Sequence, residues 1–354
     1  MLRNHLFEAT LRNAVQYRGP LNRAMSHLAA HLFKYEILEN IPLFKGVPRS
    51  ALTVSSLPGW TNSNYLITFK ENQASYVLRI PGTGSEQYID REVEAKNISI
   101  ASSLEVTSEN PFHDSSTGIQ LRPFIEGHVL YDQLGKLPPQ TVSKIGKVLR
   151  TLHRSPRQFI NTTNQFEVIE QYKTLINRKG QLLNKEYDDL DRLMREVQCR
   201  LAQLSISQVP CHNDPNLANF ILTPAHRLLL MDWEYAGNGD AAWDLGYVSN
   251  YGSFTPAEDE VLLKAYDPPL THDPNFISRM TVYKPVSEWI FALWIRLQII
   301  NGHFPVSREE LEAQERESLD NVQKNLSEQA FHQAFQSLAP VQAGHKRMGS
   351  CVTS

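Results

Sequence analysis

Apolar and polar residues alternate with a period of two from residue 51 to residue 80, a pattern typical of strands with one buried face. A turn-like stretch, PGWTNS, and a polar stretch, ENQA, interrupt the alternation and divide it into three strands. Because the three strands are consecutive and are joined by short connections, the pattern predicts that they form an antiparallel meander. A helical pattern and one more strand follow. The predicted elements are the strands ALTVSSL (51–57), NYLITFK (64–70) and SYVLRI (75–80), the helix GSEQYIDREVEAKNISIA (84–101) and the strand GIQLRPFIEG (118–127).

After Gly127 the apolar spacing changes to the three-and-four period of amphipathic helices. The sequence therefore predicts an α+β fold in which a small, antiparallel-sheet lobe precedes a larger, mostly helical lobe. One helix is expected around 142–152 and another over 182–204. The apolar face of the first is formed by Val142, Ile145, Val148, Leu149 and Leu152. The divisions we expect are a helical extension (1–49), the small lobe (50–127), the large lobe (128–340) and a flexible tail (341–354).

Composition narrows the class of protein. A chain of 354 residues with 41% apolar content is long enough for two cores. Its 35 basic and 38 acidic residues nearly balance, which argues against nucleic acid as a partner. The three cysteines lack CxxC spacing, so we expect reduced thiols. No apolar run reaches the length of a membrane span, and the prediction is a soluble, cytoplasmic protein that is not exported.

The stretch CHNDPNLANFILT, residues 211–223, crowds polar side chains against the start of an apolar run. If 218–233 forms a hairpin whose turn is centred between Ala225 and His226, Asn219 lies opposite Asp232 on one face. A loop around Asp214 would bring a second carboxylate to the same point. Magnesium binds one or two carboxylates together with substrate phosphates, and phosphoryl transfer needs that ion and a nearby base.

The spacing of these residues is that of a kinase catalytic loop. His212, Asp214 and Asn219 form H-x-D-x-x-x-x-N, and Asp232 follows on the next strand where kinases place a metal-binding aspartate. We therefore predict Asp214 and His212 as catalytic residues and Asn219 and Asp232 as metal ligands. The D-F-G and A-P-E segments of protein kinases are missing, and MDWEYAGNGDAAWDLG leaves little room for an activation loop.

A kinase of this kind also needs a basic residue on a strand of the small lobe. In YVLRI, alternation places Tyr76, Leu78 and Ile80 on the core face and Arg79 on the other face, where it can reach phosphates. We expect Glu92 in DREVEAKN to be its ion-pair partner, with Glu94 as the alternative.

Together these segments resemble the choline/ethanolamine kinase branch of the aminoglycoside-phosphotransferase-like kinases. The resemblance runs from about residue 50 to residue 326 through LPGWTNSNYLI, YVLRIPGTGSEQYIDRE, FIEG, CHNDPNLANFIL, MDWEYAG and WDLG, in that order. It implies a protein-kinase-like fold, with ATP held by the small lobe and catalysis and substrate binding in the large lobe, and it implies ATP and Mg²⁺ as cofactors. The residues that would bind the nucleotide are Asn62, Ser63 and Asn64 in the turn over the phosphates, Arg79, its partner Glu92, and Phe124.

The acceptor is predicted from aromatic residues. A trimethylammonium group donates no hydrogen bonds, so proteins recognise it through aromatic faces and nearby negative charge. Phe291 and Trp294 form one stripe of a predicted helix, and the resemblance implies that they wall a choline site. Trp243 and Tyr247 recur on another helix face together with Tyr251, and we expect Trp243 and Tyr247 to bind the substrate. The resemblance places Glu234 near the substrate and Asp244 in support of the catalytic loop.

The resulting prediction is phosphorylation of choline to phosphocholine. Ethanolamine, thiamine and, less readily, aminoglycosides stay open as alternative acceptors, and a pseudokinase is the alternative without turnover. The sequence leaves the role of residues 1–49 and the oligomeric state undecided, a homodimer included.

Overall fold

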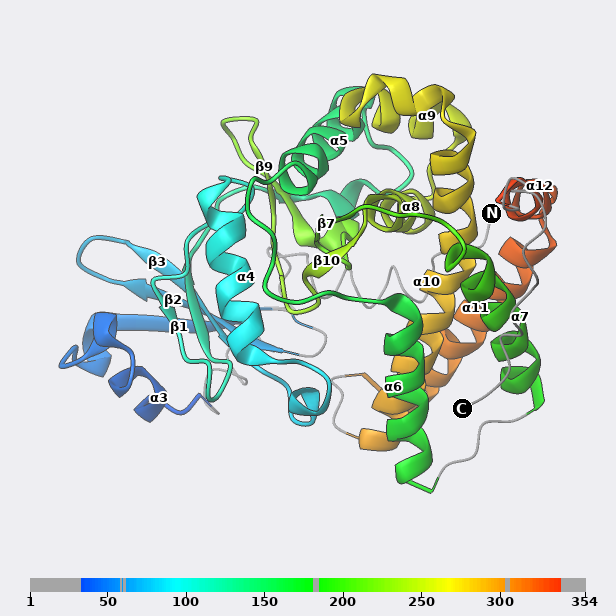
Figure 1. Cartoon of the computed structure of the whole chain (residues 1–354). Helices are drawn as coiled ribbons and strands as arrows, with labels where there is room; N and C mark the ends of the chain where they lie inside the picture. The colour runs from blue at the N-terminus through cyan, green and yellow to red at the C-terminus, as the bar shows by residue number, and fades with distance from the viewer. Residues whose placement is uncertain (1–32, 58, 60–61, 181–184, 303–305, 339–354) are drawn as a thin grey trace.

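The computed structural model of the chain describes residues 33–57, 59, 62–180, 185–302 and 306–338. The predictions for residues 1–32 of the extension and for the tail lie outside these residues. Two lobes are visible, a sheet with one long helix and a larger helical lobe (Figure 1). The predicted two-lobed α+β fold is confirmed.

The small lobe is a sheet of five strands in the order β1-β2-β3-β5-β4, with antiparallel neighbours. The predicted meander is therefore correct. The long helix α4 is capped at its N-terminus by Asp90, whose carboxylate accepts from the backbone N–H groups of Glu92 and Val93. The elements of this lobe are β1 (Leu52–Leu57), β2 (Ser63–Phe69), β3 (Ser75–Ile80), α4 (Arg91–Ser103), β4 (Phe112–His113) and β5 (Gln120–Pro123).

Strand β3 separates the core of the small lobe from the interlobe side. Leu78 is fully buried in a core to which Tyr76 and Ile80 also contribute, as the alternation predicts. Residues before β1 pack into the same core through the short helix α3 (Glu36–Glu39) and the turns after it. The buried residues of this segment are Phe33, Leu38, Ile41 and Phe44.

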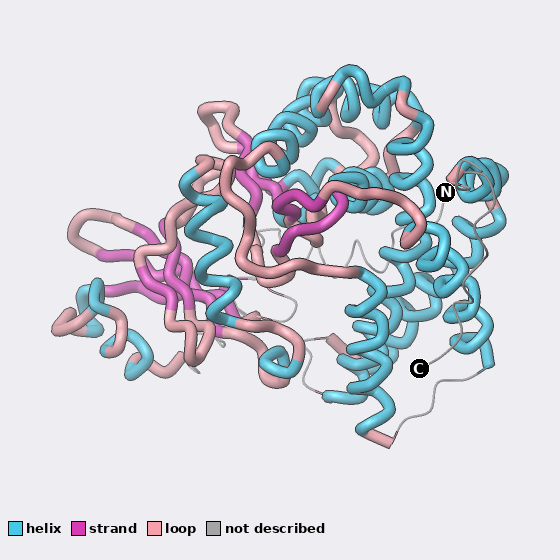
Figure 2. The backbone as a smooth tube through the Cα atoms, viewed as in Figure 1, coloured by secondary structure: helices cyan, strands magenta, loops and turns pink. Residues whose placement is uncertain are grey.

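The large lobe is helical except for two small sheets, ordered β6-β8-β9 and β10-β7 (Figure 2). The longest helix, α10, packs against α6, α8, α11 and α12. Among the described residues, none of the helices is long and apolar enough to cross a bilayer. The strands are β6 (His128–Val129), β7 (Gln208–Cys211), β8 (Phe220–Leu222), β9 (Leu228–Leu230) and β10 (Gly237–Asp240). The helices are α5 (Pro139–His153), α6 (Gln165–Arg178), α7 (Lys185–Leu201), α8 (Ala241–Tyr251), α9 (Pro256–Tyr266), α10 (Pro274–Asn301), α11 (Arg308–Ser327) and α12 (Gln329–Ser337).

The hairpin β8–β9 exists, but its predicted register is wrong by one residue. Phe220 pairs with Leu230, and five residues centred on Ala225 link the two strands. Because the N–H of Thr223 donates to the carbonyl oxygen of Arg227 at 2.9 Å, residues 224–226 form a three-residue loop. His226 closes this loop with a positive φ of 58°, the left-handed residue that three-residue hairpin loops require. Asn219 consequently lies opposite Met231, whose N–H donates to the Asn219 carbonyl oxygen at 2.8 Å.

Candidate active site

The two lobes enclose a cavity of about 1470 Å³, larger than a single small-molecule site needs. It therefore has room for a nucleotide and an acceptor together. Most of the residues predicted from the sequence line it. These are Asn62, Asn64, Arg79, Phe124, Asp214, Asn219, Asp232, Glu234, Trp243, Tyr247, Phe291 and Trp294.

Asp214 lies in the loop between β7 and β8 and is held by two donors. The hydroxyl of Tyr247 donates to its Oδ1 at 2.5 Å, and Nδ2 of Asn219 donates to its Oδ2 at 3.2 Å. Burial raises the pKa of Asp214 to about 7; Asp232 and Glu234 add to the rise and the two donors oppose it. A carboxylate whose pKa lies near neutrality is suited to accept a proton from a hydroxyl.

Asp232 follows β9 in a backbone conformation that is unusual outside glycine, with φ of +66°. Its Oδ1 is buried and accepts no hydrogen bond, although Nη2 of Arg79 lies 3.3 Å away. A buried carboxylate oxygen without a hydrogen bond fits a hard cation, and the amide of Asn219 lines the same cavity. Asn219 and Asp232 therefore suit the Mg²⁺ that the sequence predicts.

Arg79 is surrounded by acids. Its Nη1 donates to Oε1 of Glu94 at 2.5 Å, and its Nη2 donates to Oε2 of Glu234. Burial disfavours its charge, but Asp232, Glu234 and Glu94 raise the pKa of Arg79 above its usual value. With its amide oxygen turned inward, Asn62 accepts from Nε of Arg79 at 2.9 Å. The guanidinium is thus fixed in place at the edge of the cavity.

Glu94, and not the predicted Glu92, is the acid of α4 that pairs with Arg79. Glu92 is 67% exposed and pairs with Lys96 at 2.6 Å. The reason is helical periodicity: residues two apart on a helix lie on nearly opposite faces, and only Glu94 faces the sheet. Arg91 was not predicted from the sequence as a member of this cluster; its Nη1 donates to Oε2 of Glu94 at 2.8 Å. Its position three residues before Glu94 was the available signal.

Three other predicted site residues have a different environment from the one expected. His212 is fully buried and does not line the cavity; its Nδ1 accepts from the N–H of Asp214 at 3.3 Å, so it shapes the loop. Burial lowers the pKa of His212, which favours the neutral ring. Ser63 is exposed, and it faces away from the cavity because it pairs with Ile80, whose side chain lies on the other side of the sheet. Glu234 lines the cavity, but its carboxylate is engaged by Arg79 and, at 3.2 Å, by Arg91.

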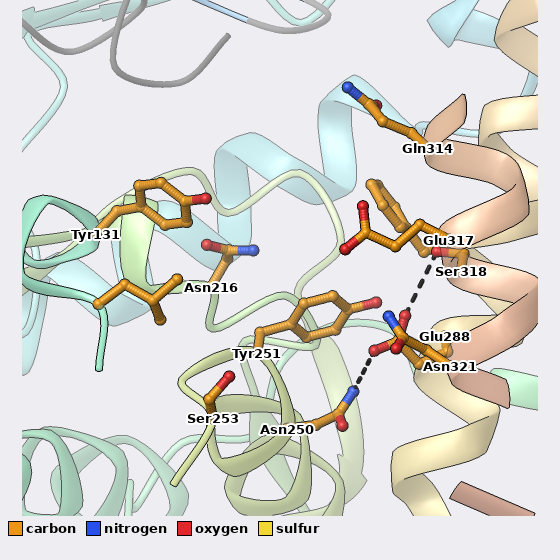
Figure 3. A pocket seen from close by; sticks show the side chains of 12 residues that line it. Tyr131, Asn216, Asn250, Tyr251, Ser253, Glu288, Gln314, Glu317, Ser318 and Asn321 are labelled. Carbon is orange, nitrogen blue, oxygen red and sulfur yellow. Dashed lines mark hydrogen bonds between the residues drawn. The ribbon is translucent and has the colours of Figure 1, made fainter. Parts of the chain in front are cut away.

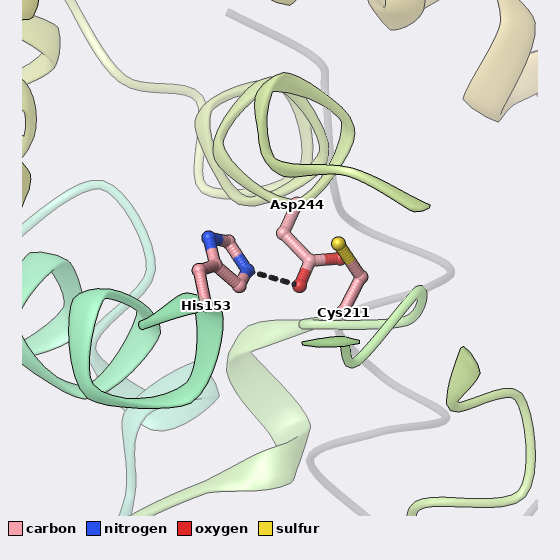
Figure 4. Close-up of side chains that lie close together, drawn as sticks. All are labelled: His153, Cys211 and Asp244. Carbon is pink, nitrogen blue, oxygen red and sulfur yellow. Dashed lines mark hydrogen bonds and ion pairs between the residues drawn. The ribbon is translucent and has the colours of Figure 1, made fainter. Parts of the chain in front are cut away.

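Asp244, at the start of α8, braces the catalytic loop. Its carboxylate accepts from the N–H groups of His212 at 2.8 Å and of Asn213 at 2.9 Å. Nε2 of His153 lies 2.9 Å from the same carboxylate (Figure 4). Cys211 lies beside this pair, and burial raises the pKa of its thiol well above the usual value. Because the Asp244 oxygens are already engaged, this cluster supports the loop and does not suit a metal ion.

An asparagine network ties α4 to the large lobe. Nδ2 of Asn97, which is fully buried, donates to Oδ1 of Asn161 at 2.8 Å and to the carbonyl oxygen of Ala236 at 2.9 Å. Oδ1 of Asn97 accepts from the N–H of Ile160 at 3.2 Å. The helix that carries Glu94 is therefore anchored to the segments that precede α6 and α8.

A continuous aromatic wall leads away from Asp214. Along α8, the rings of Trp243 and Tyr247 lie 5.9 Å apart, and those of Tyr247 and Tyr251 lie 4.5 Å apart. Tyr251 contacts Phe291 of α10 at 6.1 Å, and Phe291 stacks on Trp294 at 5.7 Å. The two predicted aromatic stripes therefore form one surface that faces the cavity.

A small side pocket of about 70 Å³ adjoins this wall (Figure 3). It has room for a few water molecules or for a small group such as an ammonium. Two acids from different helices line it, Glu288 of α10 and Glu317 of α11. Glu288 is buried and accepts from Nδ2 of Asn250 at 2.8 Å. Because Tyr251 and Phe291 line both spaces, the side pocket adds negative charge next to the aromatic wall.

Comparison with known proteins agrees with this geometry. The sequence model of the phosphotransferase enzyme family matches residues 53–275. Protein LicA of Haemophilus influenzae is 28% identical over 266 residues, which are 73% of this chain and 77% of that protein.

Among solved structures, a choline/ethanolamine kinase family protein from Mesorhizobium loti superposes with a TM-score of 0.71 at 26% identity, covering 86% of this chain and 97% of that one. The choline kinase LicA from Streptococcus pneumoniae superposes with a TM-score of 0.68 at 25% identity, covering 84% and 100%.

Proposed function

Because the chain belongs to the phosphotransferase enzyme family and is a choline/ethanolamine kinase-like phosphotransferase that acts on an alcohol, we propose that its acceptor is choline. The observation that carries this choice is the aromatic wall that begins at the Tyr247–Asp214 hydrogen bond. Choline has a hydroxyl at one end and a quaternary amine at the other. Its hydroxyl would lie at the Asp214 carboxylate, and its amine would lie against the aromatic ring faces.

In the proposed reaction, the choline oxygen attacks the γ-phosphorus of ATP while the bond from that phosphorus to the bridging oxygen breaks. ADP leaves with the electron pair of the broken bond, and Asp214 takes the hydroxyl proton. Tyr247 orients the carboxylate through its hydrogen bond at 2.5 Å. Arg79 contributes positive charge where the phosphates lie.

Asn219 and Asp232 would hold Mg²⁺, which supplies positive charge to the phosphate oxygens when it is bound. Of the nucleotide-binding residues predicted from the sequence, Asn62, Asn64 and Phe124 line the cavity on the side of the small lobe and are proposed contacts of ATP.

Ethanolamine is the second candidate because of the side pocket. A primary ammonium donates hydrogen bonds, and the carboxylates of Glu288 and Glu317 are suitable acceptors. A trimethylammonium group would be attracted by the same charge without such bonds. The two acceptors are therefore distinguished by which substitutions raise KM more, those of the aromatic rings or those of the acidic residues in the side pocket.

The test is a coupled ADP-release assay with choline, ethanolamine, thiamine and kanamycin as acceptors. Choline should give the highest kcat/KM, and Phe291→Ala and Trp294→Ala should each raise its KM by about two- to thirtyfold, the range of a cation–π contact. The neutral isostere 3,3-dimethylbutan-1-ol is the control, since it should lose much less in the same variants. A higher kcat/KM for ethanolamine that is lost in Glu288→Gln would replace choline by ethanolamine.

A further inference from the structure

Arg122 is a second arginine on the cavity side of the small-lobe sheet. It lies on β5 opposite Val77 of β3, and the neighbouring pair of the same ladder is Arg79 with Gln120. Side chains two residues apart on a strand share a face, so Arg122 and Arg79 are diagonal neighbours above the cavity. Both residues line it.

The two arginines differ in how they are engaged. The Arg79 side chain is bound by Glu94 and Glu234, whereas the Arg122 side chain forms no hydrogen bond or ion pair with any residue that the structure describes. Burial, and to a smaller extent repulsion by Arg79, lowers the pKa of Arg122 to about 10, while Asp232 opposes the decrease. Arginine remains charged at neutral pH even so. The guanidinium is only partly buried, and its donors are open to the cavity, where a ligand can accept from them.

The surroundings of Arg122 fit a planar base better than a phosphate. The phosphate end of the cavity is marked by Arg79 and Asp232, which are already close to each other. Val77, which pairs with Arg122 across the ladder, provides apolar lining, and Ile98 and Met231 add apolar lining to the same cavity. Just after β5, the segment 124–129 continues the lining toward the large lobe. An apolar surface next to the N–H donors of one guanidinium is suited to a purine, whose ring atoms accept hydrogen bonds.

We propose that Arg122 binds the N7 edge of the purine base and thereby allows the enzyme to use guanine nucleotides alongside adenine nucleotides. Guanine presents two acceptors, O6 and N7, which a guanidinium contacts in bidentate fashion. Adenine presents N7 and an amino donor, so it keeps only one of these contacts. The inference rests on the proposed function only in that a purine nucleotide occupies the interlobe cavity.

The experiment measures the affinity of the full-length protein for ADP and for GDP by calorimetry, which needs no acceptor. The variants are Arg122→Gln, whose amide suits adenine N6 and N7, and Arg122→Met, which keeps the chain length and removes the donors. We expect the ratio of the GDP to the ADP dissociation constant to rise about five- to 150-fold in Arg122→Gln. In Arg122→Met, GDP should lose more affinity than ADP.

Arg227→Gln, at the exposed tip of the β8–β9 hairpin, is the matched control and should leave the ratio unchanged. The proposal is overturned if the Arg122 variants weaken ADP and GDP equally, the result expected of a phosphate contact. It is also overturned if the wild type binds ADP but not GDP. Choline turnover is assayed separately, so its absence would reject the acceptor without affecting this ratio.

Discussion

The hydroxyl of Tyr247 donates to Asp214 at 2.5 Å, and Tyr247→Phe removes this bond while it keeps the ring. The bond stabilises the ionised form of Asp214 more than the protonated form, because a charged carboxylate oxygen is the stronger hydrogen-bond acceptor. Its loss must therefore raise the pKa of Asp214. The pKa of this group is about 7 before the change, so the base form would appear only at more alkaline pH.

The size of the shift follows from the kind of bond. A hydrogen bond to a charged group contributes about 1.5–3 kcal/mol, and one pKa unit corresponds to about 1.36 kcal/mol. The pKa of Asp214 in Tyr247→Phe should therefore rise by about one to two units. At pH 7 the ionised fraction of Asp214 falls from about one half, so kcat/KM for the acceptor should fall by about five- to fiftyfold and should recover at higher pH.

The assay is the pH profile of kcat/KM, which reports the ionisation of the free enzyme. Its acidic limb should move to higher pH in Tyr247→Phe. Tyr251→Phe is the matched control one turn along α8, because that hydroxyl donates to the Ser287 carbonyl oxygen at 3.3 Å and not to Asp214. An acidic limb that stays in place, or that moves to lower pH, would refute the assignment of Asp214 as the base.

Three further changes test the rest of the site. Asp214→Asn should lower kcat by several orders of magnitude and leave the dissociation constant of ADP nearly unchanged, measured by steady-state kinetics and calorimetry. Glu94→Gln should weaken nucleotide binding and lower the free energy of unfolding by up to about 3–5 kcal/mol, whereas Glu92→Gln, in an exposed pair, should change it by less than about 0.5 kcal/mol. Asp244→Asn should lower both the melting temperature and kcat, because the amide cannot accept all the bonds that the carboxylate does; a loss of stability with full kcat would contradict its bracing role.

Much of this arrangement was predictable because it depends on local patterns. Period-two alternation identified the three strands of the meander and the cavity-facing side of Arg79. The spacing from His212 to Asn219 identified the catalytic loop, and Asp214 and Asn219 are indeed within hydrogen-bonding distance. Helical periodicity similarly placed Tyr247 and Tyr251 on one face.

The errors arose where a side chain's role depends on what approaches it from elsewhere in the chain. The hairpin register changed by one because His226 adopts a left-handed conformation that a count of residues does not reveal. The choice between Glu92 and Glu94 depends on where α4 begins, which Asp90 determines. His212 has the motif position of a site residue, yet its ring turns into the core.

The connection from Asp232 to α8 is short, and β10 occupies half of it and leads directly into the helix. Many kinases insert a long segment at this point and switch themselves on by modifying it. Here no length of chain is left to serve as such a switch, and Asp244 already secures the loop. At this connection the catalytic loop is therefore held by fixed contacts to α8, and not by a segment whose modification could rearrange it.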